Sequence, residues 1–109
     1  MSDAVGSVFA ALADPTRRLM VEELMRDGST SVPALSAMLP ISRQAVAKHM
    51  AALDHAGLVE RSPARGREVR YRLRPHALSS AAAWMREAEG AWDGRLSRLK
   101  RAVEAGRPR

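Results

Sequence analysis

A polar surface on an alanine-rich segment holds the residues of this sequence whose types could do chemistry. Residues 41–56 read ISRQAVAKHMAALDHA, and the apolar side chains of Val46, Met50 and Leu53 recur there at helical spacing. Hydroxyl, guanidinium, amide, ammonium and imidazole groups stand beside that stripe, on Ser42, Arg43, Gln44, Lys48 and His49. Such groups can bind base edges and phosphates, and the alanines between them would let the helix enter a groove of DNA. The segment predicts a recognition helix, although an ordinary alanine-rich surface helix would share the pattern.

Arginines gather directly after this segment. The chain has 109 residues and a formal net charge of +6. Residues 57–109 carry thirteen Lys and Arg against six Asp and Glu, whereas residues 1–56 carry five against six. Six arginines fall within residues 61–74, namely Arg61, Arg65, Arg67, Arg70, Arg72 and Arg74. So dense a cationic segment favours a polyanionic partner, with a merely solubilising surface as the alternative.

Side chains that could support catalysis or hold a metal are scarce. The chain has no cysteine, which excludes disulfides, thiolate ligands and a cysteine nucleophile. It also has no glycine-rich phosphate loop and no clustered carboxylates with histidine, so we expect no catalytic residue, no metal and no cofactor. The opening MSDAVGS lacks the basic and apolar regions of a signal peptide, and no apolar run could span a membrane. We therefore expect a cytoplasmic protein.

The sequence before the recognition segment predicts three helices. An apolar helix is expected over residues 3–13, and Asp14 and Pro15 favour the start of a second one that Gly28 ends. A third helix is expected over residues 31–39. It would turn three side chains inward, those of Leu35, Met38 and Leu39.

Only a short turn separates the third helix from the recognition segment. Pro40 stops the one and Ser42 can cap the other, so residues 31–56 predict a helix-turn-helix. After Gly57 the apolar period changes to two: LVERS and EVRYRLR form a hairpin across PARGR. A ribbon over about 58–74 in this position is a wing.

The last predicted element is a long helix over about 76–105. Leu78, Met85, Trp92 and Leu99 recur every seven residues, while Glu89 interrupts the positions between them. Such a stripe exceeds what a small domain can cover, so we expect a homodimer rather than a helix folded back on its own domain. The expected interface residues are Phe9, Leu78, Met85, Trp92, Leu96 and Leu99. Residues 1–109 then form one mainly α domain with a two-stranded wing, in the order α-α-α-α-β-β-α.

Three phrases of the chain resemble the ArsR/SmtB family of winged helix-turn-helix transcriptional regulators. They are ADPTRR, ISRQAVAKHMAALDHAGLVE and GREVRYRL, and the resemblance covers about residues 7–100. It implies a homodimer joined by its first and last helices, bound to an imperfect palindrome in a promoter and usually acting as a repressor. It also implies DNA-reading roles for Ser42, Arg43, Gln44, Lys48 and His49, and wing-tip roles for Arg65 and Arg67.

The chain departs from the metal-sensing members of that family. Their CVC motif matches Ser31, Val32 and Pro33. Their ligand pairs on the last helix match Arg74 and His76, and fall near Glu87 and Gly90. We therefore do not expect a metal sensor, and a lone His76 is more typical of a surface or capping residue.

Two functional questions stay open at this level. A winged helix can instead bind protein without reading DNA, although the wing arginines favour DNA. A small apolar effector could bind between the terminal helices beside Trp84 and Trp92, although packing is the more usual role of such residues. The operator, the regulated genes, the effector and the choice between repression and activation are not encoded in any recognisable pattern.

Overall fold

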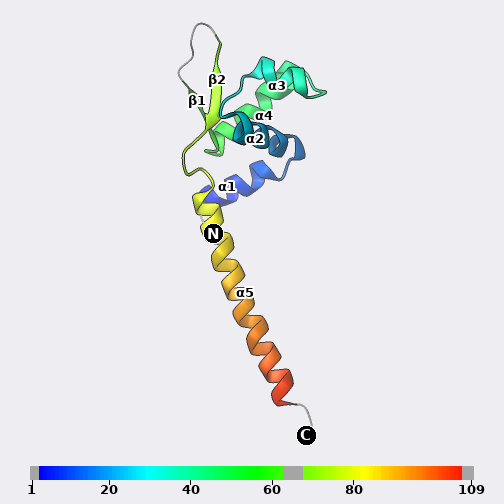
Figure 1. Ribbon diagram of the computed structural model, residues 1–109, viewed down its shortest axis with the longest axis vertical. Helices are drawn as coiled ribbons and strands as arrows, with labels where there is room; N and C mark the ends of the chain where they lie inside the picture. Colours follow the sequence, from blue (N-terminus) through cyan, green and yellow to red (C-terminus); the bar gives the residue numbers. More distant parts are fainter. Residues whose placement is uncertain (1–2, 63–67, 107–109) are drawn as a thin grey trace.

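Five helices and a two-stranded ribbon make up the part of the chain that the computed structural model describes, residues 3–62 and 68–106 (Figure 1). The elements are α1 Asp3–Leu12, α2 Pro15–Asp27, α3 Val32–Met38, α4 Arg43–His55, β1 Val59–Ser62, β2 Arg70–Leu73 and α5 Ser79–Ala105. This is the winged helix-turn-helix predicted above. The predicted wing-tip residues Arg65 and Arg67 lie outside the described residues.

The helix boundaries follow from local capping chemistry. Side-chain oxygens of Asp14, Ser31 and Ser42 accept hydrogen bonds from the backbone N–H three residues later, at 3.0, 3.2 and 3.1 Å. Gly28 and Gly57 adopt φ angles of 82° and 80°, which a side chain at Cβ would disfavour. These caps fix where α2, α3 and α4 begin and where α2 and α4 give way to loops.

The core lies between α1, α2, α3, α4 and the ribbon, a unit we call the head, and α5 adds only Ala81 to it. The buried residues of the head in this cluster are Val8, Ala11, Met20, Val21, Leu24, Leu35, Val46, Met50, Leu53, Leu58 and Val59. Of the side chains predicted to point inward from α3, Leu35 is buried and Leu39 is partly buried against this cluster. The prediction for Met38 is wrong, because 57% of this residue is exposed at the end of a helix only seven residues long.

The ribbon is tied to the helices as well as to itself. β1 and β2 pair antiparallel with Glu60 opposite Arg72 and Val59 opposite Leu73. Thr30, in the loop before α3, exchanges two backbone hydrogen bonds with Tyr71, at 3.0 and 2.8 Å. This bridge fixes the wing against the helix-turn-helix, so that both present their polar side chains from one rigid unit.

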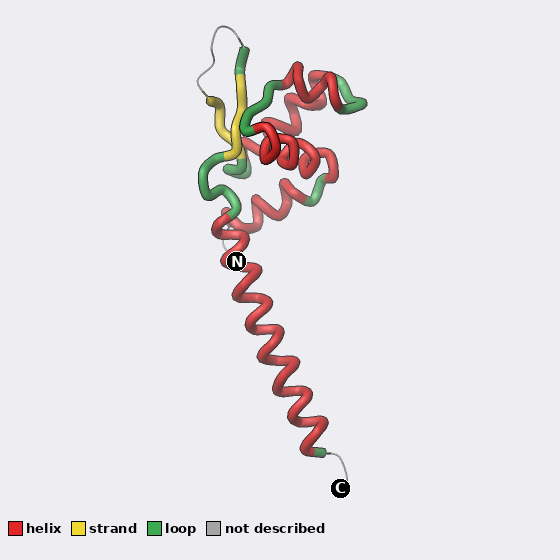
Figure 2. Tube along the Cα trace, in the orientation of Figure 1, coloured by secondary structure: helices red, strands yellow, loops and turns green. Residues whose placement is uncertain are grey.

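The helix α5 leaves the head and extends away from it (Figure 2). Of its 27 residues only Ala81 is buried, and one aromatic contact near its start, between Phe9 and Trp84 at 5.5 Å, holds it against α1. The helix therefore does not fold back over the head. It begins at Ser79 and not at residue 76, since His76 has a φ of 60° that no α-helix contains.

Candidate nucleic-acid interface

The recognition helix α4 separates its core face cleanly from its outer face. Val46, Met50 and Leu53 are 0–1% exposed. On the opposite face the side chains of Gln44, Lys48 and His55 are exposed at positions i, i+4 and i+11, with exposed Ala47 and Ala51 between them. The helix thus offers an amide, an ammonium and an imidazole in one row, on a surface low enough to enter a major groove.

Two further predicted residues lie at the start of α4. Ser42 and Arg43 are both exposed. The Ser42 hydroxyl accepts from the Ala45 N–H, which leaves its own O–H free to donate to an anion. Because the first N–H groups of a helix also favour negative charge, this end of α4 can bind phosphate.

His49 has a different environment from the other predicted contacts. Its side chain lies on the flank of α4 toward α2, only partly exposed, and its Nδ1 is 3.5 Å from Nη1 of Arg17. Arg17 also donates through Nε to the Ala11 carbonyl at 2.6 Å and through Nη2 to the Ala10 carbonyl at 3.5 Å. One guanidinium thereby joins the end of α1, the start of α2 and the flank of α4.

The surrounding residues strengthen this joint. Arg18 donates to the carbonyls of Leu12 and Ala13, at 2.7 and 3.1 Å, and so completes the end of α1. The hydrogen bond from the Arg17 backbone N–H lowers the pKa of Asp14, which stabilises the ionised cap. The phrase ADPTRR therefore encodes the predicted start of α2 and, in addition, two arginines that tie α2 to the end of α1, a role that the sequence alone did not reveal.

Three of the four wing arginines that the structure describes have polar partners in the protein. Glu60 binds two of them: its Oε1 lies 2.9 Å from Arg72 Nε, and its Oε2 lies 3.5 Å from Arg74 Nη1. Arg70 donates to the Ser29 hydroxyl at 3.1 and 3.0 Å and lies 3.6 Å from Glu68. Arg61 is exposed on β1. Part of the predicted cationic charge is thus compensated within the ribbon.

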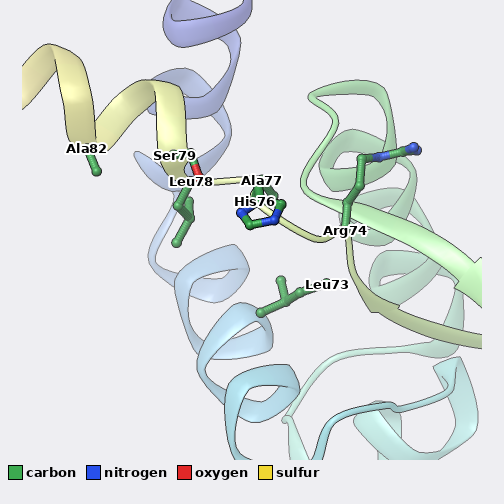
Figure 3. Close-up of a pocket in the computed structure, with 7 residues that line it drawn as sticks. All are labelled: Leu73, Arg74, His76, Ala77, Leu78, Ser79 and Ala82. Atoms are coloured by element: carbon green, nitrogen blue, oxygen red, sulfur yellow. The ribbon is translucent and has the colours of Figure 1, made fainter.

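A separate groove of about 350 Å³ lies where β2 joins α5 (Figure 3). Its lining residues are Leu73, Arg74, His76, Ala77, Leu78, Ser79 and Ala82. Leu73 and Leu78 turn toward the same space beside His76, while the Arg74 side chain points away. Within residues 3–62 and 68–106, no group of three or more His, Cys, Asp or Glu could hold a metal ion. Among the helices described, none is long and apolar enough to cross a membrane.

Sequence reasoning missed three residues of this surface: Arg17 at the joint, and Ser29 and Glu60 beside the wing. The helical spacing of Gln44, Lys48 and His55 does place His55 on the outer face of α4, although His55 is not among the predicted DNA contacts. The roles of Arg17, Ser29 and Glu60 depend on contacts between distant segments, which no local pattern contains.

Known proteins are similar to this chain in both sequence and fold. Residues 12–62 match a family described as a helix-turn-helix domain. The HTH-type transcriptional regulator Rv2034 of Mycobacterium tuberculosis is 44% identical over 72 residues, which cover 66% of this chain and 65% of that protein. The match thus spans slightly less than two thirds of this curated relative.

Two solved structures extend the comparison to most of the chain. An ArsR-like transcriptional regulator from Rhodococcus sp. RHA1 superposes with a TM-score of 0.79 at 42% identity, over 91% of this chain and 92% of that one. The homodimeric winged helix-turn-helix DNA-binding domain of Mb0332 from Mycobacterium bovis superposes with a TM-score of 0.64 at 25% identity, over 80% of each chain.

Proposed function

The chain belongs to the ArsR family of winged helix-turn-helix transcriptional regulators, and from this premise we propose that it binds operator DNA as a homodimer. In this proposal it occupies an imperfect palindrome in a promoter and represses transcription. Two copies related by a twofold axis would place their recognition helices in successive major grooves, and for this reason the site would be palindromic.

The outer row of α4 is the observation that carries the proposal. Gln44 lies at the start of this row, where its amide can bind a base edge, and Arg43 can bind guanine or a phosphate beside it. Ser42 and Lys48 would hold phosphates. The row adds His55 to this set, at the far end of the same face.

The wing supplies affinity in this proposal. Arg65 and Arg67 would reach the sugar-phosphate backbone or the minor groove beside the reading site, and Arg61 is available from β1. Contacts of this kind release counterions and do not depend on base sequence.

The proposed role of His49 is positional. Its contact with Arg17 supports a part in holding α4 against the joint of α1 and α2, in place of the direct DNA contact expected above. A displaced recognition helix would weaken binding to every DNA sequence, so His49 matters without touching a base.

The exposed stripe of α5 supports the dimer. Met85, Trp92 and Leu99 are 50–59% exposed, which is unusual for large apolar side chains on one helix face. The homodimeric relative from M. bovis is consistent with this interpretation. Phe9 contributes indirectly, since it packs against Trp84 and holds α5 on the head.

Binding to a protein partner is the second candidate function. It is favoured by Met38 and Leu19, which are both exposed and line one shallow surface pocket. A DNA-binding assay separates the two candidates. Sequencing the genomic DNA retained by the protein would identify the operator, and fluorescence anisotropy would then compare operator and random duplexes at low and high salt. We expect tighter binding to the operator at both salt concentrations. Equal affinity for both duplexes would reject the proposed function.

A further inference from the structure

A shallow pocket of about 180 Å³ lies between α2 and α3. Leu35, which is 1% exposed, lines its buried part, and Leu19, Met38 and Leu39 lie around it. Leu19 and Met38 are 53% and 57% exposed. Large apolar side chains that stay exposed around a buried leucine are typical of a surface that binds another protein. Met38 suits such a surface, because its unbranched thioether side chain can adapt to the shape of a partner.

The rim of this pocket is acidic, although the whole chain has a formal net charge of +6. Glu22 and Glu23 line the pocket together with Arg26. Arg26 Nη1 lies 2.9 Å from Oε2 of Glu23, and a hydrogen bond with Asp27 raises the pKa of the Glu23 carboxyl. Among the residues that the structure describes, no cation lies within ion-pair distance of the exposed Glu22. The pocket thus presents an unpaired carboxylate beside an apolar opening.

DNA is a poor occupant for this pocket. In the described part of the chain, its lining residues belong to α2, α3 and the turn after α3, so α4 and the wing can contact DNA without covering it. Its carboxylates would repel phosphates, in contrast to the exposed Arg43 and Lys48 of α4. The pocket also lies away from the apolar stripe of α5, because α3 is at the end of the head opposite that helix (Figure 1). These features favour a protein segment as the occupant.

We propose that this pocket docks a partner protein through a segment that carries one large apolar side chain beside a lysine or arginine. The apolar side chain enters between Leu19 and Met38 and reaches Leu35, while the cation pairs with Glu22. The charge selects the partner, because an acidic segment would be repelled. This inference adds to the proposed DNA binding, since the protein could hold the partner while the outer row of α4 is bound to DNA.

Peptide titrations followed by amide NMR spectra of the full chain test the pocket directly and without DNA. The probe is a short alanine peptide that carries one leucine between lysines. One counterpart replaces the leucine by alanine, and the other replaces the lysines by glutamates. We expect the probe to shift signals around Leu19 and Met38, and the alanine counterpart to bind at least about tenfold more weakly because no leucine is buried. Signal shifts elsewhere only, or equal affinity for the probe and the alanine counterpart, would overturn the proposal.

Two methionines provide a matched pair of variants for the apolar contact. Met38→Ser removes an apolar side chain of the pocket, whereas Met25→Ser makes the same change at a residue that is 58% exposed and lies outside the lining. Met38→Ser should weaken binding of the probe at least about threefold, because part of a methionine side chain is buried by the leucine. Met25→Ser should leave that affinity unchanged. Equal effects of the two variants would place the probe outside the pocket and overturn the proposal.

Glu22→Lys tests the charge of the rim. It should weaken the lysine probe by about two- to fivefold, as expected when an exposed ion pair is lost, and strengthen binding of the glutamate counterpart. Glu104→Lys makes the same change in net charge at the far end of α5 and should leave both affinities unchanged. If Glu22→Lys does not exchange the preference between the two peptides, the cation of the partner does not pair with Glu22 and the proposal fails.

DNA binding and sedimentation of Met38→Ser identify the other possible occupants. We expect a folded variant with unchanged DNA affinity and an unchanged oligomeric state. A folded Met38→Ser that loses DNA affinity would assign the pocket to the DNA interface, and one that dissociates would assign it to a second copy of this chain. Either result would overturn the docking of a separate partner protein.

Discussion

The head and α5 differ in how they place their large apolar side chains: the head buries them, and α5 exposes them. In the head, Met20, Leu24 and Leu53 are 0–1% exposed and every helix contributes to one core. In α5, Ala81 is the single buried residue, while Trp92 and Leu99 are more than half exposed. The head therefore supplies nearly all of the core, and α5 presents an apolar surface that a second chain would cover in the proposed dimer. From this difference we expect that folding and assembly can be disrupted separately.

The strongest way to break this comparison is to charge the stripe of α5. Leu96→Glu/Leu99→Glu removes four leucines from a dimer and adds four carboxylates. Each buried leucine contributes about 1.5–3 kcal/mol, so the dimer Kd should rise at least about 1,000-fold. Analytical ultracentrifugation would measure this loss, and circular dichroism should show that the head remains folded.

A double variant that still sediments as a stable dimer would contradict the assigned interface. A double variant that loses its secondary structure would contradict the independence of the head. The single variants Glu104→Gln and Lys100→Gln control for nonspecific effects of altered charge, because both residues are exposed near the C-terminal end of α5.

The next effect tests the core of the head. Leu24→Ala empties a site that is 1% exposed, whereas Leu19→Ala changes a residue on the same helix that is 53% exposed. We expect the first change to lower the free energy of unfolding by about 2–5 kcal/mol. The second should lower it by less than about 1 kcal/mol. Urea unfolding at one protein concentration would measure both, and equal losses would show that the head lacks the tight core described above.

The two regions also differ in how far sequence predicted them. Local signals set the head: Asp14, Ser31 and Ser42 cap helices where their residue types suggested, and Gly28 and Gly57 adopt positive φ angles. The start of α5 was missed by three residues, because nothing in its sequence announces that His76 takes a left-handed conformation. Burial of Met38 was also mispredicted, since a seven-residue helix buries less than its apolar pattern suggests.

The candidate site divides in the same way. Periodicity was enough to place Gln44 and Lys48 on the outer face of α4. It could not distinguish His49, because the flank positions of a helix become buried or exposed according to which helix packs beside them. Here α2 brings Arg17 to His49, across 32 residues of sequence. The engagement of the wing arginines by Glu60 likewise depends on the strand register, which pairs it with Arg72.

The difference between the head and α5 can be tested further, because the proposal assigns recognition of the DNA sequence to the head alone. Gln44→Ala should reduce the preference for operator over random DNA by about 1–3 kcal/mol per half-site, if its amide makes a bidentate contact with adenine. The stability and the dimer Kd should not change, since the side chain is exposed and distant from α5. Anisotropy titrations on both duplexes would measure the preference.

The wing provides the contrast for that variant. Arg65→Ala/Arg67→Ala should weaken operator and random duplexes equally and flatten the log–log salt dependence by up to about 3.6, if all four arginines of the dimer contact phosphate. Should the Gln44 variant keep full operator preference while the wing variant loses it, the wing would be the reader, acting through groove shape.

The smallest expected effect concerns the charge balance within the head. Glu60 compensates Arg72 and Arg74, whose side chains remain 51% and 47% exposed. Exposed ion pairs contribute only about 0–1 kcal/mol each, so Glu60→Gln should leave the fold intact. It should release two cations per protomer toward DNA, tighten binding to operator and random duplexes alike, and steepen the log–log salt dependence by up to about 3.6 per dimer. Glu104→Gln makes the same change in net charge at the far end of α5 and should leave that slope unaltered. A salt titration of DNA binding would measure the log–log slope for both variants. If Glu60→Gln has the same slope as Glu104→Gln, Arg72 and Arg74 do not contact DNA phosphates.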